Sequence, residues 1–161
     1  MHWSHLIHIR GRWAGKLIVK GILRGDDAAR ARECGADAVI VSGHGGRQLD
    51  AAIAPLAALS DVVAAVPGMP VILDGGVRRG TDVMKALALG AHMVMAGRPF
   101  LFSAATAGAA GVDRAIMLLR AEVERDMILA GCKTIADIGA DMVISASAFT
   151  GAWRASADDR P

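Results

Sequence analysis

The sequence predicts an α/β protein built from four successive parallel strand–helix units. Short runs of apolar, mostly β-branched residues alternate along the chain with longer segments rich in alanine and leucine. This order is typical of parallel strands joined by right-handed helical crossovers. Several of the predicted strands also run directly into glycine-rich loops, and the carboxyl ends of strands are where parallel α/β proteins bind their ligands.

The first half of the chain contains two of the predicted strands. Residues 2–13 are predicted to form a helix that Gly15 terminates, and a short strand at 16–21 follows, with Lys20 near its end. Alanines favour a helix at 26–34. The second strand, residues 38–42, is apolar up to Ser42 and is therefore expected to be buried.

The second half contains the other two strands, and its elements follow from apolar periodicity and from turn residues at their ends. They are a helix at 55–66, a turn at 67–70, a strand at 71–74, a helix at 82–89 capped by Thr81, a strand at 92–96, an amphipathic helix at 111–130 and a short helix at 134–138. The apolar stripe of the long helix is Ile116, Leu119, Val123 and Met127. Residues 145–161 are expected to form a loose tail.

The segment after the second strand carries the strongest chemical signal. Glycines at 43, 45 and 46 surround His44, and Arg47 follows three residues after it. Glycine on both sides of a polar residue adds chain entropy to the unfolded state, so it makes sense where a ligand lies against the backbone. An imidazole can take a proton, and a guanidinium can hold a carboxylate through two hydrogen bonds.

Two glycine-rich loops follow the third and fourth strands. Asp74, Gly75, Gly76, Val77 and Arg78 form the first, and Gly97 and Arg98 belong to the second. Loops of this kind after successive strands suit a phosphate, and in eight-stranded (β/α)8 barrels that site follows strands seven and eight. The four units are therefore expected to be the C-terminal half of such a barrel, in residues 1–144.

Composition excludes several other classes. Hydrophobic residues make up 53% of the chain, and the net charge of +2 has no basic block, so neither disorder nor nucleic-acid binding is expected. Cys34 and Cys132 have no metal-ligand spacing and fit a reducing cytoplasm, and no metal site is expected. No signal peptide or membrane-spanning segment is predicted. His92 is expected at the edge of the core, with Met84, Met93 and Met95 inside it.

At this point the chain resembles the FMN-dependent α-hydroxy acid dehydrogenases and oxidases, which include glycolate oxidase, lactate oxidase and mandelate dehydrogenase. Four segments carry the resemblance, in order and in register: residues 16–21, 42–50, 74–80 and 96–100. The one departure is Gly43, where the family usually has asparagine. The resemblance implies FMN as cofactor and a small L-2-hydroxy acid as substrate.

Residue roles follow from the resemblance alone. Lys20 is similar to the lysine beside the flavin N1 and C2 carbonyl, and Ser42 to a hydroxyl that contacts the flavin. His44 is similar to the catalytic base, and Arg47 to the residue that binds the substrate carboxylate. The FMN phosphate and ribityl site corresponds to Asp74, Gly75, Gly76, Val77, Arg78, Gly97 and Arg98. Arg79 is expected to be solvated.

Only the second half of the family's barrel is represented, so its first and last strands are expected to be open edges. We therefore expect either a homo-oligomer or association with a missing N-terminal half. Three functions stay open: oxidation of a hydroxy acid, a non-catalytic FMN- or phosphate-binding half barrel from a truncated gene product, and the isomerisation of isopentenyl diphosphate by a related FMN protein. The His44–Arg47 pair favours the first.

Overall fold

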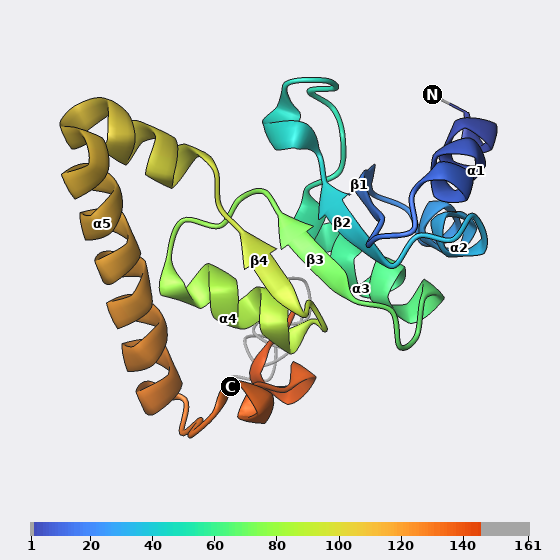
Figure 1. Ribbon diagram of the computed structural model, residues 1–161. Coiled ribbons are helices and arrows are strands. Elements are labelled where there is room, and N and C mark those ends of the chain that lie inside the picture. The colour runs from blue at the N-terminus through green and yellow to red at the C-terminus, as the bar shows by residue number, and fades with distance from the viewer. Residues whose placement is uncertain (1, 146–161) are drawn as a thin grey trace.

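A computed structural model describes residues 2–145 of the protein. Four parallel strands in the order β1-β2-β3-β4 alternate with helices, which confirms the predicted half of an α/β barrel (Figure 1). The elements are α1 (Trp3–Arg12), β1 (Ile18–Ile22), α2 (Gly25–Glu33), β2 (Ala38–Ser42), η1 (His44–Gly46), α3 (Pro55–Ala65), β3 (Val71–Asp74), α4 (Gly80–Ala88), β4 (Met93–Met95), α5 (Arg98–Leu129), η2 (Ile135–Asp137) and η3 (Ala140–Met142).

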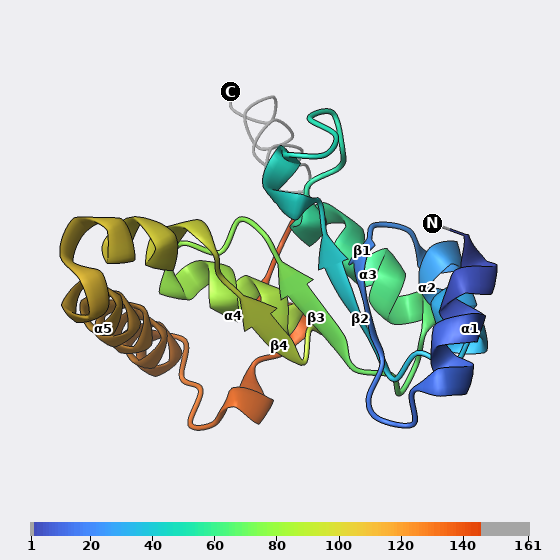
Figure 2. The same cartoon turned by 45° about the horizontal axis from the view of Figure 1, so that its top comes forward.

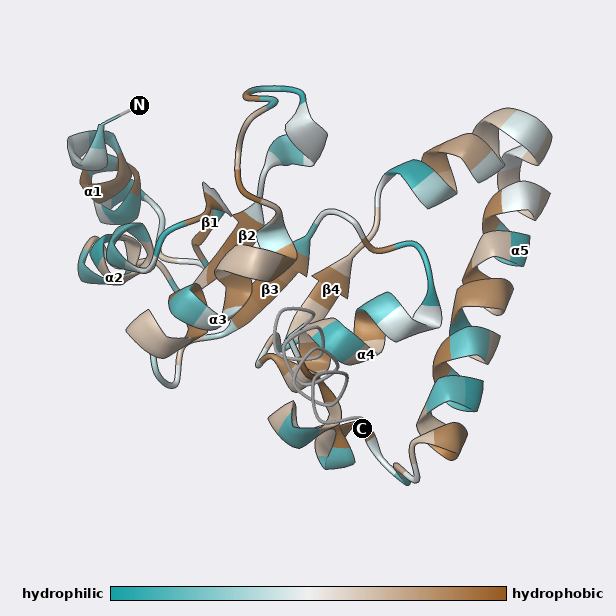
Figure 3. Ribbon diagram, turned by 180° about the vertical axis from the view of Figure 1, so that it is seen from behind, coloured by the Kyte–Doolittle hydropathy of each residue, from teal (hydrophilic) through white to brown (hydrophobic). Residues whose placement is uncertain are grey.

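One face of the sheet packs against the helices and forms the main core. Side chains alternate between the two faces along each strand. The helix-covered face carries Val19, Val39, Val41, Val71, Leu73 and Val94. Seen from behind, α3 and α4 lie over this side of the sheet, and the strands are its most hydrophobic part (Figure 3). Burial against these helices holds the four units together.

Among residues 2–145 no helix covers the opposite face of the sheet, which carries the residues that matter for the site. The strand register places Lys20 level with Ile40, and Ser42 directly beside Asp74. Ser42 and Ile40 are two residues apart, so all four side chains project from this one face. In a closed barrel this face is the interior.

The two edge strands are much more exposed than the central ones. All five residues of β2 are buried, whereas Ile18 of β1 is 48% exposed and Met93 of β4 is 57% exposed. Met95, also on the uncovered face, is 40% exposed. The prediction that Met93 and Met95 are core residues is therefore wrong, because nothing within the described residues covers their side of β4.

Helix α5 begins earlier than the sequence predicted. It starts at Arg98, not at 111, and its helical dihedral angles break at Ala107 and Gly108, where the chain bends sharply (Figure 1). After the bend the helix runs alongside α4 (Figure 2). Leu119 and Val123 of the predicted stripe pack against the main core, but Ile116 is exposed.

Other predicted boundaries needed smaller corrections. Strand β1 continues past Lys20 to Ile22, through an irregularity at Gly21. Helix α4 begins at Gly80 with Arg79 as its N-cap residue, so Thr81 lies inside the helix and does not cap it. The carboxylate of Asp82 accepts hydrogen bonds from the backbone N–H groups of Arg78 and Arg79 and so satisfies this end of the helix.

Three further expectations concern single residues and the tail. Cys34 and Cys132 are both buried and form no disulfide, as expected of small apolar residues. His92 is exposed, and its Nδ1 accepts a hydrogen bond from the Val71 backbone N–H. Apart from Ser145, the predicted tail at 145–161 lies outside the described residues.

Candidate functional site

A cavity of about 560 Å³ lies at the carboxyl ends of the four strands, the side toward which all the arrowheads point in Figure 1. The loops after β2, β3 and β4 form most of its wall, and Lys20 reaches it from β1. Its lining residues are Lys20, His44, Gly45, Arg47, Gln48, Asp74, Gly75, Gly76, Val77, Arg78, Met95, Ala96, Gly97, Arg98, Pro99 and Leu101. Every site residue that the sequence predicted lines this cavity except Ser42.

Ser42 lies beneath the cavity floor, where only 1% of its surface is exposed. Its Oγ donates a hydrogen bond of 2.7 Å to Asp74 Oδ2 and accepts one of 3.1 Å from the His44 backbone N–H. The ammonium of Lys20 lies 3.4 Å from the same Oγ and also pairs with Asp74. Ser42 therefore joins groups from β1, β3 and the loop after β2.

The carboxylate of Asp74 is charged in this setting. Burial alone would raise its pKa, but hydrogen bonds from Lys20 and Ser42, together with the positive charge of Lys20, more than offset this and lower the pKa of Asp74. Asp74 thus holds the ammonium of Lys20 as an ion pair at the edge of the cavity.

His44 stands in a tight turn that only its glycine neighbours make possible. Its own φ is 51°, and Gly45 and Gly46 follow with φ of 70° and 78°. His44 is the only non-glycine residue with positive φ in residues 2–145, a conformation that costs on the order of 1 kcal/mol. Such local strain is common at functional sites.

The cavity is built for an anion. Lys20, Arg47, Arg78 and Arg98 contribute positive charge, and Asp74 is the only carboxylate among the lining residues. In the part of the chain that the structure describes, the three guanidinium groups form no ion pair. They are available to bind phosphate or carboxylate through paired hydrogen bonds.

Helix α5 adds a feature that the sequence analysis missed. Its first turn, with Arg98, Pro99 and Leu101, lines the cavity. A helix N-terminus presents free N–H groups and a partial positive charge, which favour phosphate. Pro99 in the first turn was a signal of this helix start that the sequence offered.

The glycine loops leave room for a phosphate-bearing cofactor next to their backbone. A Cβ added to Gly76 or to Gly97 would meet no atom within 4 Å. Both residues line the cavity, so ligand atoms can approach the backbone N–H groups there. With Arg78 and Arg98 beside these loops, the residues suit a phosphate dianion.

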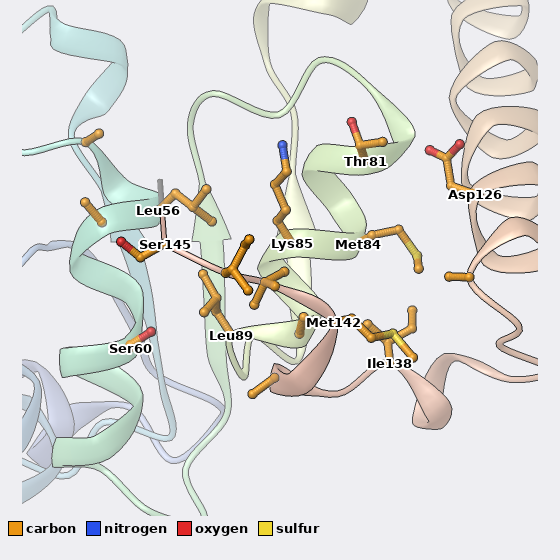
Figure 4. A pocket seen from close by; sticks show the side chains of 17 residues that line it. Leu56, Ser60, Thr81, Met84, Lys85, Leu89, Asp126, Ile138, Met142 and Ser145 are labelled. Atoms are coloured by element: carbon orange, nitrogen blue, oxygen red, sulfur yellow. The ribbon is translucent and has the colours of Figure 1, made fainter. Parts of the chain in front are cut away.

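A second cavity, of about 1080 Å³, lies on the outer side of the helix layer (Figure 4). Apolar side chains from α3, α4 and the segment 138–144 make up most of its wall. None of the predicted site residues lines it, and its two charged residues are Lys85 and Asp126. It lacks the convergent polar groups of the cavity at the strand ends. Within residues 2–145 no cluster of three or more possible metal ligands occurs.

Comparison with known proteins identifies the family. Residues 1–145 match the FMN-dependent dehydrogenases. The chain belongs to the FMN-dependent dehydrogenase family. It is 55% identical over 137 residues to L-lactate oxidase of Nostoc sp., and 46% identical over 140 residues to (S)-mandelate dehydrogenase of Pseudomonas putida. These matches cover 84% and 87% of the chain but only 38% and 35% of the two relatives.

Solved structures of the FMN-dependent dehydrogenase family support the fold. A crystal structure of monotopic membrane protein (S)-mandelate dehydrogenase matches with a TM-score of 0.85 and 46% identity, over 88% of this chain and 38% of that one. A structure of mandelate oxidase with benzoyl-formic acid matches with a TM-score of 0.81 and 44% identity, over 84% and 41%. The chain therefore spans less than half the length of these FMN-dependent relatives.

Membership of the FMN-dependent dehydrogenase family confirms the predicted resemblance, the half-barrel fold class and the family's cofactor, FMN. The relatives are named for oxidation of hydroxy acids, which disfavours the isomerase alternative. None of the helices in the described residues is long and apolar enough to cross a membrane.

Proposed function

We propose that this chain supplies the FMN-binding and proton-abstracting half of an enzyme that oxidises an L-2-hydroxy acid to the 2-oxo acid. The substrate would resemble lactate, glycolate or mandelate, as the names of the relatives suggest. One observation carries the proposal: His44 and Arg47 line the same cavity as the glycine loops and Lys20. A base, a side chain that can bind a carboxylate, and loops that can bind a phosphate thus line the same cavity.

The substrate-handling roles follow from the chemistry of the side chains. Arg47 binds the substrate carboxylate through two hydrogen bonds and so orients the hydroxyl-bearing carbon. His44 removes a proton from the substrate as general base. FMN, when bound, would accept the two electrons and the second hydrogen that leave the substrate. Lys20 places a positive charge where the flavin gains negative charge on reduction.

Charged side chains and backbone N–H groups both contribute to binding the cofactor. Arg78 and Arg98 neutralise the phosphate, and the N–H groups of Gly75, Gly76 and Gly97 donate hydrogen bonds to it. Val77 is buried and anchors the first loop to the main core. Asp74 contributes through its ion pair with Lys20.

We further propose that the chain works with a second barrel half. Within residues 2–145, β1 and β4 are edge strands, each paired with a neighbouring strand on one side only, and both carry exposed side chains. A half barrel also leaves its interior uncovered. The second half is either the N-terminal half found in the longer relatives or a second copy of this chain. A strictly monomeric chain in sedimentation, with full FMN binding, would count against this.

A second candidate function is that of a non-catalytic FMN- or phosphate-binding half barrel, such as a truncated gene product. It is favoured by the open strand edges within residues 2–145. The two candidate functions differ in whether the protein turns over a hydroxy acid. We expect the isolated chain to be weakly active or inactive.

An absorbance spectrum of the purified chain with added FMN, followed by anaerobic addition of L-lactate or L-mandelate, tests the proposal. A bound-flavin spectrum that bleaches supports catalysis, and bound flavin without bleaching supports the binding half barrel. No bound flavin would show that the cradle needs the other half, which is then added to repeat the test. In the active assembly, His44→Ala should abolish flavin reduction and spare FMN binding; retained reduction would overturn its role as base.

The location of the protein is proposed to be cytoplasmic, on the basis of the two free cysteines. Relatives differ in this respect, since one is named as peroxisomal and a solved (S)-mandelate dehydrogenase is titled a monotopic membrane protein. Fractionation of cells that express the tagged protein tests this proposal.

A further inference from the structure

The start of α4 is held by carboxylates from two different helices. Backbone N–H groups at the start of a helix have no acceptor within that helix. Asp82 of α4 accepts hydrogen bonds from the N–H groups of Arg78 and Arg79, each at 3.0 Å. Glu122 of α5 accepts a hydrogen bond of 2.8 Å from the N–H of Gly80. The end of the loop after β3 is therefore fixed by α4 and α5 together.

Glu122 also binds the side chain of Arg79. Its carboxylate lies 2.8 Å from Arg79 Nε. The hydrogen bond from Arg79 first, and then the one from the Gly80 N–H, lower the pKa of Glu122, so its carboxylate is charged at neutral pH. Arg78 lines the cavity at the strand ends, whereas the guanidinium of Arg79 is held at α5 and Arg79 is not part of the cavity wall.

The contact between Glu122 and the start of α4 depends on the glycine at position 80. A Cβ added to Gly80 would stand 2.6 Å from the backbone carbon of Glu122 and 2.7 Å from the Glu122 Cβ. Helix α5 also contributes Arg98 and Pro99 of its first turn to the wall of the cavity. One helix thus lines the cavity with its first turn and, through Glu122, holds the loop after β3.

We infer that Glu122 is a positioning residue, which fixes the loop after β3 through the Gly80 N–H and so keeps the guanidinium of Arg78 at the cavity. The inference rests on the proposed function, because it deepens the assignment of Arg78 to the FMN phosphate. Glu122 is not part of the cavity wall and acts through the backbone at the start of α4. A binding group is most effective when the residues around it hold it in place.

Glu122→Ala tests the inference by comparing the binding of FMN with that of riboflavin, which lacks the phosphate. FMN affinity should fall by roughly fivefold to tenfold because Arg78 loses its fixed place, and riboflavin affinity should stay the same. Electrostatics alone predicts the opposite sign for FMN, since removal of an anion near a phosphate site strengthens phosphate binding.

Glu124→Ala is the matched control for Glu122→Ala. It removes a carboxylate from the same helix, together with an ion pair to Arg120, and should change neither affinity. Unchanged or tighter FMN binding by Glu122→Ala would overturn the inference. An equal loss of FMN and riboflavin binding would also overturn it, because general destabilisation of the fold would then account for the effect.

Glu122→Gln provides a second variant if the alanine variant fails to fold. Glutamine keeps an oxygen that can accept the hydrogen bond from the Gly80 N–H, but it carries no charge. FMN affinity should therefore stay within about twofold of the wild type, because the backbone contact is retained. A loss as large as that expected of alanine would overturn the assignment to the Gly80 N–H.

Hydrogen exchange in the chain without FMN separates this inference from the proposed function. The amide hydrogen of Gly80 should exchange about fivefold faster in Glu122→Ala, because its acceptor is lost, and at the wild-type rate in Glu124→Ala. Unchanged exchange in Glu122→Ala would overturn the inference. A wild-type chain that binds no FMN, alone or assembled with a second half, would refute the proposed function, and Gly80 exchange would then decide whether Glu122 holds the start of α4.

Discussion

The imidazole of His44 lies directly against the backbone of Gly21. A Cβ added to Gly21 would stand 2.6 Å from His44 Nε2, closer than a Cβ atom approaches a non-bonded neighbour. Gly21 has φ of 99° and lies at the irregularity in the β1–β2 register. The absence of a side chain at one residue of β1 thus makes room for the candidate base of the neighbouring loop.

Gly21→Ala should therefore displace the His44 ring as well as destabilise the chain. The positive φ costs on the order of 1–2 kcal/mol for alanine. Denaturant unfolding measures that cost, and the NMR signals of the His44 ring report its displacement. Gly68→Ala is the control, because Gly68 has φ of 79° but nothing within 4 Å of an added Cβ. Equal effects of both variants on the His44 ring would contradict the contact.

Arg78 and Arg79 are neighbours with different surroundings. Arg78 lines the cavity, whereas the guanidinium of Arg79 pairs with Glu122 of α5 at 2.8 Å. Arg78→Ala should weaken FMN binding about tenfold to a hundredfold, from the loss of a charge-assisted contact to phosphate. Arg79→Ala should leave FMN affinity nearly unchanged. Fluorescence titration of FMN against each variant measures this, and equal weakening would refute the assignment of Arg78 to the phosphate.

Much of the candidate site could be predicted because its residues follow strands directly. When parallel strands lie side by side, the loops at their carboxyl ends must meet. Thus His44 and Arg47 after β2 and Arg78 after β3 came together as expected. The position of Ser42 could not be predicted, since whether a hydroxyl at a strand end faces a ligand or its own neighbours depends on the register of Ser42 with Asp74.

The exposed methionines and the bent helix also escaped prediction. Met93 and Met95 have the composition of a core strand, but no element within residues 2–145 covers their side of β4. The break at Ala107 and Gly108 hid the first turns of α5, because the sequence there is small and lacks an apolar period. Arg79 is 67% exposed, as expected of a solvated residue, and only its pairing with Glu122, which depends on the distant packing of α4 against α5, was not predicted.

Gly80 of α4 packs tightly against α5. A Cβ there would stand 2.6 Å from the backbone carbon of Glu122 and 2.7 Å from Asp126 Oδ2. Gly80→Ala should therefore destabilise the chain by about 1–3 kcal/mol through overpacking, although alanine favours helices. Gly11→Ala in α1 meets no atom within 4 Å and should instead stabilise by about 0.5–1 kcal/mol. Urea unfolding of both variants measures these effects, and a neutral Gly80→Ala would contradict the close packing.

Asp37 should make the stability of the chain depend on pH. Its carboxylate accepts hydrogen bonds from the Leu17 backbone N–H at 2.9 Å, from Lys16 at 3.0 Å and from Arg10 at 3.1 Å. The bond from Leu17 first, and then those from Lys16 and Arg10, lower the pKa of Asp37 in the folded chain. Its contribution is therefore complete above the unfolded pKa of about 3.9 and is lost as pH falls through the lowered folded value.

Asp37→Asn should weaken this dependence on pH. The asparagine keeps an acceptor oxygen but cannot titrate, so the variant should be less stable near neutral pH and approach the wild type as pH falls below about 3.9. Denaturant unfolding midpoints at several pH values measure the difference. Asp113→Asn on α5 removes an exposed carboxylate that forms no ion pair or hydrogen bond within residues 2–145, and it serves as the control. If the difference in stability between Asp37→Asn and the wild type stayed constant down to acid pH, the charge of Asp37 would not stabilise the contact between α1 and the start of β1.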